Sequence, residues 1–169
     1  MGNCKAIEAT VVFLVSTDPT GRPVVLLGRK SLHASFAAGK LVPPGGKCDA
    51  GESHEMCAIR EYKEETGVVL DGATLELVAD FHSYIDGKPL FHVVIYIARA
   101  YSGIPVESIE MRPEWHAIED IPYDEMLEGD EAWVPRILRG ECLIVRKHMY
   151  AGGSWAIHIF PMPTQTAAE

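Results

Sequence analysis

Residues 46–68 read GKCDAGESHEMCAIREYKEETGV, in which a glycine-led loop precedes a run with helical spacing. Ser53 is a residue type that favours a helix N-cap, because its hydroxyl can accept a hydrogen bond from a free backbone N–H. Gly67 is the type that favours the position just after a helix, where the backbone is left-handed. The sequence therefore predicts a helix over residues 53–66 between two loops.

Three carboxylates share one face of this predicted helix. At 100° per residue, Glu61, Glu64 and Glu65 fall within an arc of about 100°, and the small residues Cys57 and Ala58 leave room beside them. Like charges at this spacing repel, and the helix dipole disfavours anions near the C-terminus. Mg²⁺ removes that cost because it prefers carboxylate oxygens. The pattern indicates a metal site, and the alternative is a solvated charged face.

The opposite face of the predicted helix is expected to pack against the core, and it carries Met56, Ile59, Tyr62 and Thr66. Residues 46–68 hold three basic and six acidic side chains, a net charge of −3. One or two Mg²⁺ ions would reverse that sign and admit a polyphosphate. The Gly45-Gly46 pair would let the backbone approach such a centre closely.

The whole chain has the composition of one globular domain, residues 1–169, with 47% hydrophobic and 23% charged residues. Its net charge of −9 argues against a nucleic-acid partner, which requires a basic surface. Cys4, Cys48, Cys57 and Cys142 lack CxxC spacing, which indicates reduced thiols of an intracellular protein. The seven histidines lack metal-ligand spacing and are expected at ordinary surface or sheet positions.

Stable membrane insertion is not expected, because the longest apolar stretch, residues 91–100, is too short to span a bilayer. The chain begins like an acylation site, with Gly2 and Cys4, but Ala6 stands where that motif needs Ser or Thr. Membrane association by N-terminal acylation therefore stays an open alternative to a cytoplasmic, nuclear or mitochondrial location. Residues 1–8 and 161–169 are expected to be flexible.

The remaining pattern is that of a mixed α/β domain in which strands predominate. Strands are predicted over residues 10–15, 23–29, 74–84, 90–100, 114–118, 142–149 and 154–160. Short helices are predicted at 123–127 and 131–139, and a long loop at 31–46.

The full pattern Gx5Ex7REYxEExGV over residues 46–68 resembles a complete Nudix box. Seven fixed residue types recur by chance in about one window in 10⁸ to 10⁹, so the resemblance is specific. It implies the Nudix fold, an α/β/α sandwich around a mixed sheet. It also implies Mg²⁺-dependent hydrolysis, with Mn²⁺ as a substitute metal, of a nucleoside diphosphate linked to another group. Tyr62 stands where an aliphatic residue is usual, which is expected to affect packing only.

The resemblance also implies what individual residues do. Glu61, Glu64, Glu65 and Glu110 would bind metal together with the carbonyl of Gly45. Arg60 would orient the carboxylates, and Gly46 and Glu52 would support them. Either Glu61 or Glu110 would act as the general base.

Residues 103–135 extend the resemblance to the animal-type MutT homologues, which hydrolyse oxidised purine nucleoside triphosphates such as 8-oxo-dGTP to the monophosphate and pyrophosphate. In that comparison Lys30 lies near the phosphates, Phe36 and Asp130 line the base pocket, and Trp133 either shapes the pocket or packs in the core. Val42, Leu127 and Gly129 replace residues that contact the base in those enzymes.

The hydrolytic residues are thus complete while the base pocket departs from the pattern. We expect a monomer that hydrolyses oxidised purine nucleoside triphosphates. The alternatives are hydrolysis of another nucleoside diphosphate derivative, such as ADP-ribose, a nucleotide sugar or a dinucleotide polyphosphate, and a non-catalytic nucleotide-binding module.

Overall fold

The computed structural model describes residues 5–163, so the predicted acylation sites Gly2 and Cys4 lie outside the described residues. The first half contains β1 (Ile7–Thr17), β2 (Pro23–Lys30), β3 (Leu41–Val42), β4 (Gly45–Lys47), α1 (His54–Thr66), β5 (Val69–Leu70), η1 (Gly72–Thr74), β6 (Glu76–Ile85) and β7 (Lys88–Ala98). The second half contains β8 (Tyr101–Ser102), β9 (Met111–Ala117), η2 (Ile118–Asp120), η3 (Tyr123–Glu125), α2 (Asp130–Leu138), β10 (Leu143–Met149) and β11 (Trp155–Pro161). Within this range no helix is long and apolar enough to cross a membrane.

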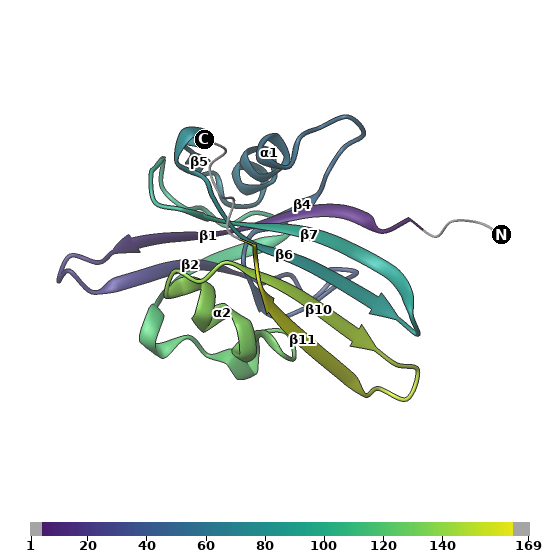
Figure 1. The fold of residues 1–169 in the computed structure, drawn as a ribbon. Helices are drawn as coiled ribbons and strands as arrows, with labels where there is room; N and C mark the ends of the chain where they lie inside the picture. Colours follow the sequence, from purple (N-terminus) through teal and green to yellow (C-terminus); the bar gives the residue numbers. More distant parts are fainter. Residues whose placement is uncertain (1–4, 164–169) are drawn as a thin grey trace, which may run out of the picture.

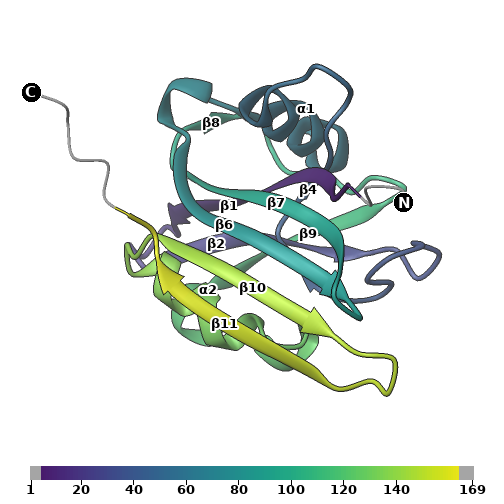
Figure 2. The same cartoon turned by 45° about the vertical axis from the view of Figure 1, so that its right-hand side comes forward.

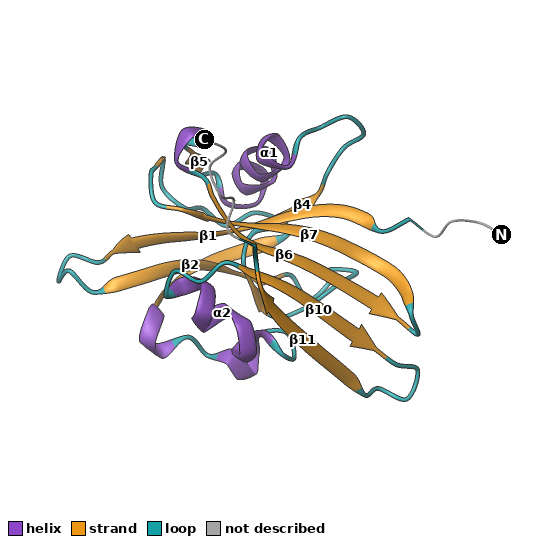
Figure 3. Ribbon diagram, viewed as in Figure 1, coloured by secondary structure: helices purple, strands orange, loops and turns teal. Residues whose placement is uncertain are grey.

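The main sheet is mixed and is covered by a helix on each face. Its strand order is β11-β10-β6-β7-β1-β2-β3, with β4 paired to β1 and β9 paired to β2. The pairs β1–β7 and β6–β10 are parallel, and the other pairs are antiparallel. Figures 1 and 3 show α1 on one face and α2 on the other, which confirms the predicted α/β/α sandwich. Figure 2 shows the β10–β11 hairpin along one edge of the sheet.

Both faces of the central strands are buried, because alternate side chains enter two separate cores. On the α1 face, Val12 and Leu14 belong to a buried cluster with Ala58 and Tyr62. On the α2 face, Phe13 belongs to a second cluster that includes Trp133. The two cores hold α1 and α2 to opposite faces of the sheet.

The predicted boundaries of α1 are confirmed. The Ser53 hydroxyl accepts a hydrogen bond from the Met56 N–H, and Gly67 has φ 75° while its N–H donates to the Lys63 carbonyl. The predicted packing face was wrong for Met56, whose exposed fraction is 64%. Glu65 is buried instead, because the helix turns part of its carboxylate face toward the sheet.

Several other predictions differ in extent. The loop expected at 31–46 contains β3 and the start of β4, and the helix expected at 123–127 is the short 3₁₀ turn η3. Ile7 and Glu8 are paired with β7 instead of lying in a flexible terminus, and β11 continues to Pro161. Paired partners distant in the sequence extend these strands beyond what local patterns indicate.

Tyr62 offers a test of the packing under α1. Its side chain is fully buried, and its hydroxyl has no hydrogen-bond partner in the described part of the chain. We expect Tyr62→Phe to raise the free energy of unfolding by about 1 kcal/mol, because it removes an unsatisfied buried hydroxyl. Chemical denaturation measures this, with exposed Tyr150→Phe as the control. A clear loss of stability in Tyr62→Phe would contradict it.

Candidate active site

Two glycines bring the backbone of β4 against the acidic side of α1. Gly45 has φ 155°, a backbone conformation that favours glycine. A Cβ atom at Gly45 would lie 2.1 Å from the Thr10 carbonyl oxygen, and one at Gly46 would lie 2.3 Å from Oε2 of Glu61. A side chain is excluded at Gly45 by the backbone of β1, and one at Gly46 would displace the Glu61 carboxylate, so backbone polar groups lie beside the carboxylates.

Arg60 holds several of the acidic groups in place. Its Nε donates to Oε1 of Glu52 and its Nη2 donates to Oε2, both at 2.8 Å. Its Nη1 donates to Oε1 of Glu61 at 2.7 Å and to Oε2 of Glu64 at 3.4 Å. The Arg60 guanidinium and the Asp49 N–H hold the pKa of Glu52 at about 2. Arg60 therefore fixes an ionised Glu52 on one side and orients Glu61 on the other.

Glu65 occupies the most buried position among these carboxylates, with 3% of its side chain exposed. Its Oε2 accepts from the Gly45 N–H at 2.9 Å, and its Oε1 accepts from Lys30 Nζ at 3.1 Å. Burial nevertheless raises the pKa of Glu65, and the charge of Glu110 adds to the effect. Lys30 and the Gly45 amide thus hold the carboxylate without removing the cost of burying it.

Glu61 is in a similar state. Burial raises its pKa, Arg60 opposes that rise, and the charges of Glu64 and Glu110 add to it. The Glu110 backbone carbonyl accepts from the Ser31 N–H at 2.8 Å, which ties the segment before β9 to the end of β2. Glu110 is therefore close enough in space to act on both Glu61 and Glu65.

The structure thus brings together residues that the sequence spreads over some 80 positions. The group consists of Lys30, Gly45, Gly46, Glu52, Arg60, Glu61, Glu64, Glu65 and Glu110. The atoms of this group that could bind a metal are oxygens, and several of them belong to negatively charged, partly buried carboxylates. This donor set fits a hard divalent cation such as Mg²⁺, which offsets charge that the protein alone leaves uncompensated. The assignment of individual ligands stays a prediction.

The predicted base pocket lies on the α2 face. Asp130 is buried, and burial raises its pKa to about 7. Trp133 Nε1 donates to its Oδ1 at 3.2 Å, and the Asp130 N–H donates to the Leu127 carbonyl. The Trp133 ring lies 6.1 Å from Phe13 and 5.6 Å from Phe81, so this tryptophan packs in the core and positions Asp130.

Phe36 and Val42 complete the predicted pocket residues. The Phe36 side chain is exposed, and its ring lies 5.8 Å from Phe91 of β7. Val42 is buried in β3. Phe91 and Val93 are two residues apart in β7, so their side chains lie on the same face of the sheet. Val93 is paired with Phe81 of β6, whose ring contacts Trp133 of α2. Phe36 therefore covers the α2 face, on which Asp130 also lies.

Trp155 and Lys147 were missed by the sequence analysis. A Cβ atom at Gly129 would lie 3.2 Å from the Trp155 ring, so this half-exposed indole is next to Asp130 in space. Lys147 Nζ lies 5.5 Å from the centre of the same ring and donates to the Glu128 carbonyl. No local motif marks these positions, because the β10–β11 hairpin reaches Gly129 only in the folded chain.

The described cysteines, Cys48, Cys57 and Cys142, are free thiols, in agreement with the prediction. Cys48 and Cys57 group with Glu52 as donors within 4.8 Å of one another, although no CxxC spacing announces them. Burial raises the pKa of both thiols, which keeps them protonated. Protonated thiols of this kind are unsuited to act as nucleophiles.

The Glu52–Arg60 pair predicts a pH dependence of stability. Because the folded-state pKa of Glu52 is lowered from 4.5 to about 2, its stabilising effect is complete above pH 4.5 and is lost as the pH falls toward 2. We expect Glu52→Gln to be less stable than the wild type at pH 7 and the difference to shrink over that range. Denaturant unfolding at several pH values measures it.

Glu119→Gln serves as the control, since Glu119 pairs with Arg22 at an exposed surface where 71% of its side chain is accessible. A stability difference between wild type and Glu52→Gln that stayed constant down to pH 2 would contradict the prediction.

Comparison with known proteins gives matches in both sequence and structure. Residues 7–139 match the NUDIX domain family. An oxidized purine nucleoside triphosphate hydrolase from Danio rerio is 40% identical over 116 residues, which cover 68% of this chain and 72% of that protein. The Mus musculus protein of the same name is 39% identical with the same coverage.

A solved structure of a MutT protein from Bacillus halodurans has a TM-score of 0.73 to this chain at 24% identity. The alignment covers 93% of this chain and 99% of that chain. At this identity the likeness establishes the shared fold.

Proposed function

The chain belongs to the NUDIX domain family, and on that premise we propose that it hydrolyses purine nucleoside triphosphates that carry an oxidised base. The products would be the nucleoside monophosphate and pyrophosphate. The observation that carries the proposal is the position of Glu61 and Glu65, which Arg60 and Lys30 hold against the backbone of β4. The substrate class follows from the names of the Danio rerio and Mus musculus relatives.

The metal would be Mg²⁺, with Mn²⁺ as a substitute. Glu61, Glu64, Glu65 and Glu110 would hold it together with the Gly45 carbonyl. When bound, the cation neutralises phosphate charge and lowers the pKa of a water molecule. Lys30, whose side chain is 17% exposed, adds a positive charge beside Glu65 for the phosphate chain.

Hydrolysis forms a bond from a water oxygen to one phosphorus of the triphosphate. The bond from that phosphorus to the oxygen that bridges the monophosphate and the pyrophosphate breaks, and the bridging oxygen leaves with the other product. A carboxylate must remove the proton of the water, and Glu61 and Glu110 are the candidates. Arg60 keeps Glu61 oriented for either the ligand or the base role, since one of its nitrogens lies 2.7 Å from Oε1 of Glu61.

Asp130 supports an altered purine as the base. A carboxyl group with a pKa of about 7 is present in both protonation states at neutral pH, so it can donate or accept a hydrogen bond. Such a group suits a base edge whose donors and acceptors change on oxidation. Trp155 and Phe36 offer exposed aromatic rings, and stacking on a ring is worth about 1–3 kcal/mol. These rings would supply the contact to the base that Leu127, in place of the residue usual in the related enzymes, does not.

We propose further that the chain acts as a monomer on the nucleotide pool of the cytoplasm, nucleus or mitochondria. Its net charge of −9 disfavours a nucleic-acid substrate.

A substrate panel tests the proposal. With Mg²⁺ present, we expect kcat/KM for 8-oxo-dGTP or 2-oxo-dATP to exceed that for dGTP and dATP by about tenfold or more, which corresponds to about 1.4 kcal/mol. Product analysis should show pyrophosphate. A flat profile, or preference for ADP-ribose or a diadenosine polyphosphate, would overturn the substrate assignment.

Removal of one carboxylate separates an enzyme from a binding module. We expect Glu65→Gln to lower Mg²⁺-dependent kcat by a factor of about 10² or more. Thermal stability should change little, because the loss of the Lys30 ion pair is offset by the removal of a buried charge, and the amide oxygen can still accept from the Gly45 N–H. Glu55→Gln is the matched control, since Glu55 is an exposed carboxylate in the first turn of the same helix. Full activity in Glu65→Gln would contradict its assignment as a metal ligand.

A further inference from the structure

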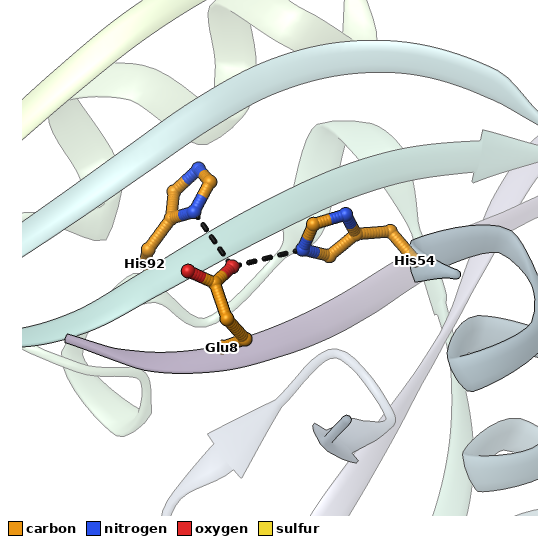
Figure 4. A group of neighbouring side chains, drawn as sticks. All are labelled: Glu8, His54 and His92. Atoms are coloured by element: carbon orange, nitrogen blue, oxygen red, sulfur yellow. Dashed lines mark hydrogen bonds and ion pairs between the residues drawn. The ribbon is translucent and has the colours of Figure 1, made fainter. Parts of the chain in front are cut away.

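A histidine and carboxylate cluster lies on the α1 face, outside the acidic group described above. Glu8 of β1 is paired in register with His92 of β7, and His54 is the first residue of α1. Oε2 of Glu8 lies 2.8 Å from Nδ1 of His92 and 3.0 Å from Nε2 of His54. Figure 4 shows the two imidazole rings directed at this one carboxylate. These histidines lie at partly exposed sheet and helix positions, as expected, and the fold brings them together.

A second carboxylate orients the central histidine. His92 Nε2 lies 2.5 Å from Oδ1 of Asp80, so both ring nitrogens of His92 face a carboxylate. His82 stacks on His92 with ring centres 4.6 Å apart, and its Nε2 lies 3.1 Å from the other Asp80 oxygen. A carboxylate behind the distal nitrogen of a histidine is the usual arrangement around metal-binding imidazoles.

We propose that His54 Nε2, His92 Nδ1 and the Glu8 carboxylate form a binding site for a divalent transition metal of the Zn²⁺ class. The three donor atoms lie within 4.8 Å of one another. Tetrahedral Zn²⁺ with bonds of about 2.0–2.1 Å places its donors about 3.3 Å apart. The two distances from Glu8 therefore need to widen by a few tenths of an ångström, and the two histidine nitrogens, which lie within 4.8 Å of each other, need to reach the same separation. Imidazole nitrogens favour this metal class over Mg²⁺.

The hydrogen bonds of His92 agree with a cation at this position, because each of its ring nitrogens faces a carboxylate oxygen. Without a metal, hydrogen bonds to both carboxylates require a proton on each ring nitrogen. A metal ion replaces the Nδ1 proton, and Asp80 continues to accept from Nε2. The site thus already balances a positive charge between Glu8 and Asp80.

The site is accessible and separate from the acidic group of α1. Glu8 and His92, together with His82 but without His54, line an open cavity of about 270 Å³, through which a water molecule or a small ligand could reach these two donors. Seven residues separate His54 from Glu61, a distance of roughly 10 Å along a helix axis. The Cys48, Glu52 and Cys57 group is a weaker candidate, because Arg60 already holds both oxygens of Glu52.

A bound ion would join the first turn of α1 to β1 and β7. We expect the purified full chain to bind one equivalent of Zn²⁺ in calorimetry and to melt at a higher temperature with Zn²⁺. Co²⁺ in place of Zn²⁺ should give visible absorption typical of tetrahedral coordination. His54→Gln and His92→Gln should each lose this equivalent and the absorption.

Matched variants identify the site. Asp80→Asn should weaken Zn²⁺ binding by about 10–100-fold, because Asp80 positions a ligand without being one. His158→Gln, outside the cluster, and Glu65→Gln should leave the equivalent in place. Binding that persists in His54→Gln, binding lost in Glu65→Gln, or no binding by the wild type would each overturn the proposal. Circular dichroism shows whether each variant is folded, and none of these outcomes depends on nucleotide hydrolysis.

Discussion

The backbone of β4 lies so close to β1 that Gly45 cannot carry a side chain, and at Gly46 a Cβ atom would collide with the Glu61 carboxylate. The positions of the acidic residues depend on this contact. The Gly45 N–H holds the innermost carboxylate, Glu65, at 2.9 Å, and Gly46 leaves space for Glu61. A larger residue at Gly45 would push β4 away from β1, and one at Gly46 would displace the Glu61 carboxylate.

This contact buries the carboxylates of Glu61 and Glu65, and burial disfavours their charged form. Two basic side chains offset part of that cost. Arg60 joins Glu52 to Glu61, and Lys30 pairs with Glu65. The pKa values of Glu61 and Glu65 remain raised. The acidic group can therefore accept further positive charge. A metal ion supplies such charge in enzymes that hydrolyse polyphosphates. Preorganisation of this kind costs stability in the absence of the ligand.

Local signals predicted the parts of the fold that depend on neighbouring residues. Ser53 and Gly67 mark the ends of α1 because caps involve atoms within a few residues. The buried face of α1 was less predictable, since hydrophobic periodicity assigns an acidic residue such as Glu65 to solvent. The Nudix pattern brought the metal-binding candidates to attention as a set. Trp155 and the cluster of Glu8, His54 and His92 carried no comparable signal, because sheet pairing alone brings their segments together.

The parallel pairing of β1 with β7 also determines the order in which the site can assemble. Glu8 is paired with His92, more than eighty positions later, and α1 lies in the connection between the two strands. Contacts of such sequence separation carry a large loop-closure cost and slow folding. Glu110, whose charge acts on both Glu61 and Glu65, follows β7 in the chain, so the acidic group is complete only after the second half of the domain has been made. The acidic group is therefore completed late in folding, because its helix residues lie close together in the chain while Lys30 and Glu110 lie 80 positions apart.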